Sequence, residues 1–356
     1  MLQIDHLPGR TITVEGKEYL YCSGTSYLGM GDNVAFAAQL AERMKRYGTN
    51  YSSSRLSNLQ LQIFDEAETF MANFTGAAAA VTVSSGYLAG QMVVKALQHQ
   101  GHFIYAPGTH PAVWLDVPVW EEPNYNSWVA GINDRIGQSP RREVVIVCYS
   151  LDPLLVRKHD FNWMNHIPSS HSVTMLIDDS HGFGIIGREG AGIFTELTLP
   201  SHIRLAVITS FGKAFGIPGG VVLGDQPFID QLRKSLFFSA SSPVIPAYLF
   251  AFLQSAEIYR KARIRLLNNI AHFSEQIGNL GLFQTFPDYP VFYSPDNHLH
   301  DYLQERQVLI SCFPYPSPQD SCITRVVLSS LHTPEDIDRL ATLIRQYANE
   351  QPKQIS

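Results

Sequence analysis

A lone lysine, Lys213, stands among small and apolar residues between two predicted strands, 205–211 and 219–225. An ammonium group in such surroundings is either solvated on a surface loop or held in a pocket, where its amine acts as a nucleophile. A nucleotide-binding P-loop is excluded, because the GxxxxGK[ST] spacing is missing and Ala214 follows the lysine. The chemistry of Lys213 therefore depends on the groups that converge with it.

An acid and two imidazoles follow other predicted strands. Asp178 and His181 come at the end of the apolar run 172–179, and His110 follows a strand and a Pro-Gly turn. Ligands of open α/β sheets bind at the carboxyl ends of the strands, where these side chains would lie. Taken singly, each also fits an ordinary role as a turn former or as a histidine satisfied by its neighbours.

The strand 78–85 ends in Ser84 and Ser85, and Gly86 begins a predicted helix. The first N–H groups of a helix bind anions such as phosphate, although an ordinary N-cap serine gives the same pattern. The strand ends thus offer a lysine, a carboxylate, two imidazoles and an anion site. Pyridoxal 5'-phosphate (PLP) requires this set: its aldehyde binds a lysine, its ring nitrogen a carboxylate, and its phosphate N–H groups and hydroxyls.

The elements that would position these groups change in character along the chain. Two short strands, 11–14 and 18–22, precede helices predicted over 33–46 and 59–74. Val- and Ile-rich runs then alternate with helical segments, which predicts a largely parallel sheet buried on both faces. After Pro243 two helices, short strands and a last helix, capped by Thr333, predict a small α+β unit. We expect an N-terminal segment (1–45), a large PLP-binding α/β domain (46–240) and a small C-terminal domain (241–356).

Composition excludes several classes of protein. The 356 residues are 45% hydrophobic and 16% charged, with a formal net charge of −6, typical of a globular enzyme and not of a disordered chain. There is no basic run for a nucleic acid and no apolar run of about 20 residues to span a membrane. The start lacks a signal-peptide pattern and the four cysteines show no metal-binding spacing, so we expect free thiols, no metal and a cytoplasmic location.

Seven motifs, in order, resemble those of the α-oxoamine synthases, which are PLP-dependent enzymes of fold type I. They are SYLGM, YGTNYSSSR, SSGYLAG, DDSHGFGIIGREGAG, TSFGKAFGIPGG, FFSASSP and RVVLSSLHTPEDIDRL. The resemblance covers nearly the whole chain. It implies an α/β fold with a large three-layer domain, a mostly parallel sheet and a smaller α+β C-terminal domain.

The resemblance also implies roles around the PLP ring. Lys213 would bind the aldehyde of PLP and abstract the α-proton of the amino acid, and Asp178 would pair with the pyridine nitrogen. His181 and Ser150 would lie at the phenolic oxygen, and His110 would stack on the ring. All four catalytic assignments (Lys213, His110, Asp178 and His181) thus fall at strand ends.

Further roles concern the phosphate and the substrate. The residues matched to phosphate binding are Ser85, Gly86, Tyr87 and Ser210, with Ser241 reaching the phosphate of a partner subunit. Arg325 would clamp the substrate carboxylate, a bidentate task that suits guanidinium, and Arg55, in the loop after Tyr51, is assigned to substrate binding with it. A homodimer is expected, because sites in this family form between subunits.

The implied reaction condenses an amino acid with an acyl-CoA thioester, with loss of CoA and CO2. The sequence reads most like the 8-amino-7-oxononanoate synthase branch of the biotin pathway, which uses alanine; 2-amino-3-ketobutyrate CoA ligase and serine palmitoyltransferase are the alternatives within the family. Some positions depart from the family pattern: Asn50 and serines replace glycines, and Pro153 and Ile323 replace a glycine and an arginine. An aminotransferase-like enzyme without a CoA substrate, or a paralogue that binds without turnover, therefore stays open.

Overall fold

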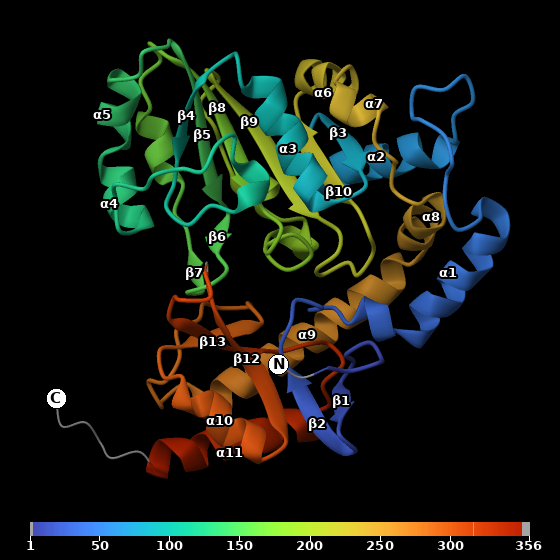
Figure 1. Cartoon of the computed structure of the whole chain (residues 1–356), viewed down its shortest axis with the longest axis vertical. Helices are drawn as coiled ribbons and strands as arrows, with labels where there is room; N and C mark the ends of the chain where they lie inside the picture. The colour runs from blue at the N-terminus through green and yellow to red at the C-terminus, as the bar shows by residue number, and fades with distance from the viewer. Residues whose placement is uncertain (1–2, 316, 351–356) are drawn as a thin grey trace.

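The large sheet of the protein has six strands. The computed structural model describes residues 3–315 and 317–350 (Figure 1). Along the sheet the order is β3 (Ala79–Val83), β10 (Gly220–Gly224), β9 (Ile203–Ser210), β8 (Ser172–Asp178), β5 (Glu143–Tyr149) and β4 (His102–Tyr105). β4, β5, β8 and β9 are parallel neighbours, and only β10 runs antiparallel to β9 and β3. The predicted, largely parallel sheet is confirmed, and five strands end at the same edge.

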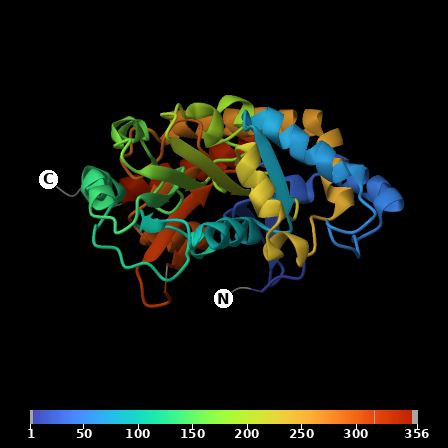
Figure 2. The same ribbon diagram turned by 90° about the horizontal axis from the view of Figure 1, so that it is seen from above.

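Helices cover both faces of this sheet, as the apolar runs require. Along β5, Val145 and Val147 pack on the face covered by α3 (Gly86–Leu97) and α6 (Gln226–Arg233). Val144, Ile146 and Cys148 pack on the other face, with α2 (Gln62–Thr75), α4 (Tyr125–Ala130) and α5 (Ile132–Gly137). Both sets are buried, so β5 reads as a continuous apolar run. Figure 2, the view from above, shows the strands enclosed between helices. The result is the three-layer α/β fold that the resemblance implies.

A second sheet of five strands joins the N-terminal strands to strands from the last quarter of the chain. Its order is β1 (Thr11–Val14), β2 (Lys17–Cys22), β12 (Val308–Pro314), β13 (Cys322–Val327) and β11 (Val291–Ser294), with β2 parallel to β12. Helices α9 (Ala256–Ile277), α10 (His298–Glu305) and α11 (Pro334–Glu350) belong to the same unit, below the large sheet in Figure 1. The hydroxyl of Thr333 accepts from the N–H of Asp336 (3.3 Å), which confirms the predicted cap. The division of the chain at residues 45 and 240 stays a prediction.

The remaining helices are α1 (Val34–Tyr47), α7 (Leu236–Ser239) and α8 (Pro246–Gln254). α1 follows the prediction and ends at Gly48, whose φ is 69°. α2 begins three residues later than predicted. The carbonyl of Leu59 accepts from the hydroxyls of Tyr51 (2.8 Å) and Ser57 (2.7 Å), and these bonds hold the chain before α2 in a loop.

A short hairpin, not predicted from the sequence, lies between the two sheets. It consists of β6 (Leu151–Asp152) and β7 (Arg157–Lys158) and extends from the large sheet toward the small one in Figure 1. Two side chains of the small unit hold its turn: Gln284 donates to the carbonyl of Leu155, and Arg325 donates to the carbonyl of Pro153. The hairpin therefore connects the two parts of the fold beside the edge where the strands end.

Candidate active site

A cavity of about 180 Å³ lies at the carboxyl edge of the large sheet. Seven of the residues predicted for the site line it: Gly86, Tyr87, His110, Asp178, His181, Ser210 and Lys213. Ala112, Tyr149 and Ser180 complete the wall. Residues separated by more than 120 positions in the sequence thus face one space.

The strand register explains why these groups meet. Tyr149, at the end of β5, lies opposite Asp178, at the end of β8, and Asp178 lies opposite Ile208 of β9. The N–H of Ser150 donates to the carbonyl of Asp178 (3.0 Å), which continues the ladder past the last residue of β5. Because neighbouring parallel strands end at the same level, each contributes its first loop residues to one site.

Lys213 lies in the turn between β9 and β10. The N–H of Phe211 donates to the carbonyl of Gly219 (3.0 Å), and the N–H of Ile217 donates to the carbonyl of Phe211 (3.2 Å). These two bonds join the start of the turn to its end. Burial lowers the pKa of Lys213 to about 8, against the opposing effect of Asp178 and Asp179. The amine is therefore available in its neutral form at a moderately alkaline pH, as a nucleophile requires.

The two imidazoles are neutral near pH 7. Burial lowers the pKa of His110, and burial followed by the charge of Lys213 lowers the pKa of His181 well below its ordinary value. Each neutral ring carries one donor and one acceptor nitrogen. Asp178 is 6% exposed, and its Oδ1 accepts from the N–H of Ser180 (2.9 Å), which fixes the carboxylate at the cavity wall.

Tyr27 is a site residue that the sequence analysis did not identify. Its hydroxyl lies 3.0 Å from Nδ1 of His181, and its ring is 2% exposed. The buried Tyr289 packs against it, with ring centroids 6.4 Å apart, and the Tyr289 hydroxyl has no hydrogen-bond partner among the described residues. The only signal in the sequence was the position of Tyr27 within the SYLGM motif. Tyr27 fixes one nitrogen of His181 and leaves Nε2 for a ligand.

Asp179 was also missed as a separate functional position. It is 1% exposed, and its Oδ2 accepts from the N–H of Ile193 (2.8 Å). A Cβ on Gly182 or on Gly192 would lie 2.2 Å from its carboxylate oxygens, so the glycine-rich segment closes around this side chain. Burial raises the pKa of Asp179 to about 7. Asp179 anchors the loop that follows His181.

The start of α3 forms the anion site. Ser85 caps the helix, since its hydroxyl accepts from the N–H of Leu88 (3.1 Å). Gly86 and Tyr87, whose N–H groups have no acceptor within the helix, line the cavity. A Cβ on Gly86 would lie 2.7 Å from the Cβ of Ser210, so only glycine allows the helix to begin this close to β9. Backbone donors, the helix dipole and the Ser210 hydroxyl together suit a phosphate.

Two predicted residues lie beside the cavity and have unused polar atoms. Ser150 is 1% exposed and its Oγ has no hydrogen-bond partner among the described residues. Arg325 is 8% exposed; it donates to the carbonyl of Pro153, and its Nε has no partner within the same residues. Such groups are stabilised by a ligand that accepts from them. With the phosphate cradle, Lys213 and Asp178, they fit each polar group of PLP and a substrate carboxylate.

Two other predicted residues are not at the cavity. Ser241 lies on the surface, where its hydroxyl donates to the carbonyl of Phe237. Arg55 is buried against Glu68, with two hydrogen bonds of 2.8 and 3.3 Å, and its guanidinium lies 4.3 Å from the ring centre of Phe64. The guanidinium of Arg55 is thus engaged in an internal ion pair, and we do not carry its assignment to substrate binding further.

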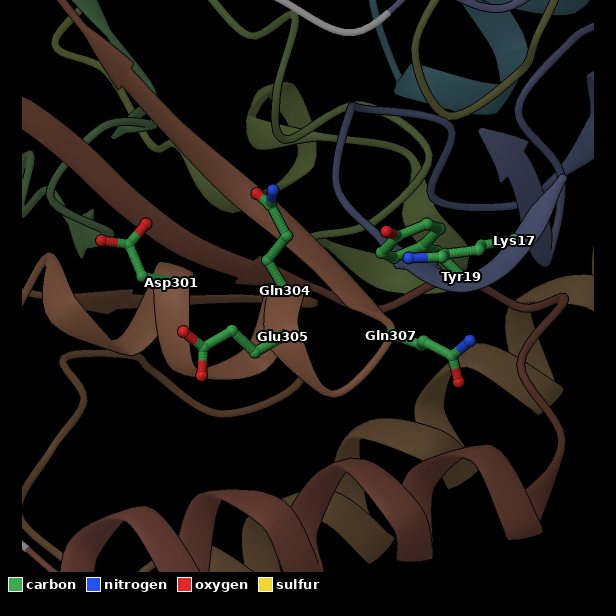
Figure 3. A pocket seen from close by; sticks show the side chains of 6 residues that line it. All are labelled: Lys17, Tyr19, Asp301, Gln304, Glu305 and Gln307. Atoms are coloured by element: carbon green, nitrogen blue, oxygen red, sulfur yellow. The ribbon is translucent and has the colours of Figure 1, made fainter. Parts of the chain in front are cut away.

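Another hollow, of about 560 Å³, lies between β2 and α10 (Figure 3). Its side chains are polar: Lys17, Tyr19, Asp301, Gln304, Glu305 and Gln307. None of them is a residue that the sequence analysis singled out. In the part of the chain that the structure describes, no helix has the length and hydrophobicity needed to cross a bilayer.

The chain is similar to known proteins over most of its length. The family model described as aminotransferase class I and II matches residues 25–344. The 8-amino-7-oxononanoate synthase of Dechloromonas aromatica (strain RCB) is 27% identical over 364 residues, which cover 96% of this chain and 92% of that protein. These findings confirm the resemblance inferred from the motifs.

Solved structures agree in fold. The serine palmitoyltransferase of Sphingomonas wittichii superposes with a TM-score of 0.82 at 18% identity and covers 99% of this chain and 93% of its own. A serine palmitoyltransferase from S. paucimobilis with bound PLP superposes with a TM-score of 0.79 at 18% identity, covering 98% and 92%. The fold is that of fold-type I PLP-dependent transferases.

Proposed function

The chain belongs to the aminotransferase class I and II family, and from this premise we propose that it is a PLP-dependent acyltransferase of the α-oxoamine synthase type. One observation carries the proposal: a single cavity brings Lys213, Asp178 and His181 to the N-terminus of α3. These are the amine, the carboxylate, the imidazole and the anion site that PLP requires.

Different residues would bind different groups of the cofactor. Asp178 would hold the ring nitrogen protonated, His181 would bind the phenolic oxygen with Ser150 beside it, and His110 would cover one face of the ring. The phosphate would lie at Gly86, Tyr87 and Ser210, with the Ser85 cap behind them. When bound, PLP supplies an electron sink that stabilises negative charge at the α-carbon of an amino acid.

The chain's own groups then act on the substrate. Arg325 orients the carboxylate of the amino acid, and the neutral amine of Lys213 removes the α-proton and later returns one. Burial keeps the pKa of Lys213 at about 8, which is close to physiological pH. A base with such a pKa can both take up and release a proton during the reaction.

The overall reaction joins the α-carbon of the amino acid to the acyl carbon of a thioester. The C–S bond of the thioester breaks and releases the free thiol, and the carboxylate leaves as CO2, which gives an α-amino ketone. Alanine is the proposed amino acid and CoA the proposed thiol carrier, as in 8-amino-7-oxononanoate synthase. Serine palmitoyltransferase-like or ketobutyrate ligase-like substrates are the second candidates, favoured by the structural similarity to serine palmitoyltransferases.

We infer a homodimer in the cytoplasm. Exposed apolar side chains gather on the loop before α2 and on α7: Leu56 is 59% exposed, Leu59 68% and Leu236 80%. The Ser54 hydroxyl donates to the carbonyl of Ser239 (2.8 Å), so the two segments form one surface. Ser241 follows α7 directly, which supports its assignment to the partner's site. The four free cysteines fit a reducing compartment.

Thiol release tests the proposed function. The holoprotein is mixed with alanine, glycine or serine and a series of acyl-CoA esters, and free thiol and product mass are followed. We expect release that depends on one amino acid and is absent in Lys213→Ala. If no pair of substrates releases thiol while the protein exchanges amino groups between amino and keto acids, the aminotransferase alternative replaces the proposal.

A further inference from the structure

A second and larger chamber adjoins the cavity of Lys213. Its volume is about 660 Å³, and Tyr149 lines both spaces. Residues of the β6–β7 hairpin form one wall, and Phe286 and Ile323 of the small unit lie among the lining residues. The chamber therefore lies between the two parts of the fold and shares Tyr149 with the cavity of Lys213.

The chamber wall is held firmly in place. Gln284 donates to the carbonyl of Leu155, Arg325 donates to the carbonyl of Pro153, and the Asp152 carboxylate accepts from the N–H groups of Leu154 (2.8 Å) and Leu155 (3.0 Å). Val156 is 1% exposed with a φ of 56°, a conformation that a β-branched residue adopts only when its surroundings impose it. Backbone strain of this kind is concentrated at ligand-binding segments.

The chamber has an apolar part and a basic rim. Leu154, Leu155, Phe286 and Ile323 offer hydrocarbon surface, beside polar residues such as Asn124 and Thr285. At the rim, Arg157 and Lys158 of β7 are exposed and have no hydrogen bond or ion pair to another side chain in the described part of the chain. His159 adds no charge, because burial lowers its pKa to about 4. Among the described residues that line the chamber, Arg157 and Lys158 therefore supply the positive charge, and the Asp152 carboxylate, held by two backbone N–H groups, supplies a negative one.

We propose that this chamber binds the acyl chain of the thioester substrate, with an anionic group of that substrate at Arg157 and Lys158. The inference rests on the proposed function, since it names where the second substrate lies. Two of the departures from the family pattern meet here: Ile323 lines the chamber, and the carbonyl of Pro153 holds Arg325. An isoleucine in place of an arginine leaves the wall apolar, which favours a hydrocarbon chain beside Arg325.

The anion has two possible sources, a carboxylate at the far end of the chain or the phosphates of CoA. Four thioesters of equal chain length separate them: CoA and N-acetylcysteamine carriers, each with a methyl or a carboxylate chain end. Binding of the corresponding non-reactive thioethers to the holoprotein is measured by calorimetry, and kcat and KM are measured for the thioesters. The calorimetric readout does not depend on turnover. A protein that binds the thioethers but releases no thiol contradicts the proposed function and not the binding role of the chamber.

The apolar wall is tested with Ile323→Trp, which fills the chamber. Ile264→Trp is the matched control, because Ile264 is an exposed residue of α9. We expect Ile323→Trp to weaken binding of the longest thioether about tenfold, the equivalent of removing burial for one or two methylenes. The Kd of Ile323→Trp for the acetyl thioether stays within about twofold of wild type, and so does the Kd of Ile264→Trp for both thioethers. Equal loss for acetyl and long chains, or no loss for either, overturns the assignment.

The basic rim is tested with Arg157→Glu/Lys158→Glu. The control is Arg141→Glu/Arg142→Glu, an exposed pair next to the opposite end of β5. We expect about a tenfold higher Kd for the anionic probes, an effect that shrinks at high salt, and no change for the methyl-ended N-acetylcysteamine probe. If only the CoA probes lose affinity, the rim binds the phosphates of CoA. If only the carboxylate-ended probes lose affinity, the rim binds the far end of the acyl chain. Unchanged Kd for all four probes overturns the role of the rim.

Discussion

The hydroxyl of Tyr27 lies 3.0 Å from Nδ1 of His181, across 154 residues of sequence. Tyr27 follows β2 of the small sheet and His181 follows β8 of the large one, so this bond joins the N-terminal segment to the reactive site. Since His181 is neutral, its two nitrogens have opposite roles, and the partner of Nδ1 decides which role remains for Nε2. Tyr27 is thus a positioning residue that acts through His181.

Tyr27→Phe removes this bond without leaving a large cavity. We expect kcat to fall about fivefold, the equivalent of one hydrogen bond, and the 15N chemical shifts of His181 to report a mixture of tautomers in the PLP-free protein. Tyr347→Phe is the matched control, because Tyr347 is equally buried and its hydroxyl bonds to Asp296 in the small unit. A single unchanged tautomer in Tyr27→Phe contradicts the positioning role.

Lys213 predicts a specific dependence of stability on pH. Its pKa is about 8 in the folded protein, against an ordinary value of 10.5 for a lysine. Between these values the unfolded chain binds more protons at this residue, so the free energy of unfolding of the PLP-free protein rises with pH across this window. Below pH 8 both states are protonated and the contribution stays at its minimum.

The difference between wild type and Lys213→Met isolates this effect. Unfolding by urea at pH 7.5, 9 and 10.5 measures it. From the lowest to the highest pH, the free energy of unfolding of wild type should rise by up to about 3 kcal/mol relative to that of the variant. Titrating groups that do not interact with Lys213 contribute equally to both proteins and cancel. A constant difference between the two proteins means that the amine is solvated and not held in the cavity.

Gly86 tests the phosphate cradle. Gly86→Ala places a methyl group 2.7 Å from the Cβ of Ser210, so α3 and β9 must separate. We expect destabilisation of about 1–3 kcal/mol and weaker PLP binding, measured by equilibrium dialysis. Gly137→Ala, at the end of α5 with open space around its Cα, should leave both quantities unchanged. Wild-type PLP affinity in Gly86→Ala argues against a phosphate at this helix start.

Arg55 is expected to act on stability and not on substrate affinity. Arg55→Ala leaves the buried Glu68 with Arg233, 2.7 Å from Oε2, as its cation and with Thr82 as a neutral donor, and we expect a loss of about 3 kcal/mol. Arg55→Met combined with Glu68→Gln should regain part of that loss. Arg325→Lys, in contrast, should raise the KM for the amino acid, because an ammonium cannot bind a carboxylate in the bidentate way. A raised KM in Arg55→Met/Glu68→Gln would restore the assignment of Arg55 to the substrate.

Local patterns were sufficient to predict most of the fold and the centre of the site. The Val- and Ile-rich runs predicted the parallel strands, and strands that end side by side place Lys213, Asp178 and His181 together without further information. Arg55 looked functional because its motif is local, whereas its partner Glu68 lies on α2 and its burial is a property of the packed protein. Sequence alone does not show which guanidinium is already paired.

The remaining site features depend on contacts between distant segments. Tyr27 reaches His181 only because β2 pairs with β12 and brings the N-terminal segment into the small sheet. The β6–β7 hairpin has two-residue strands, too short for any periodicity, and its position depends on Gln284 and Arg325. These features follow from tertiary packing, and the periodicity of single segments carries no information about it.

Covalent trapping of the cofactor tests the central claim most directly. The protein is loaded with PLP, reduced with borohydride, digested and analysed by mass spectrometry. The account predicts one pyridoxyl phosphate group per chain, on the peptide that contains Lys213, and none after Lys213→Ala. Modification of another lysine, or no modification of the loaded protein, would contradict it.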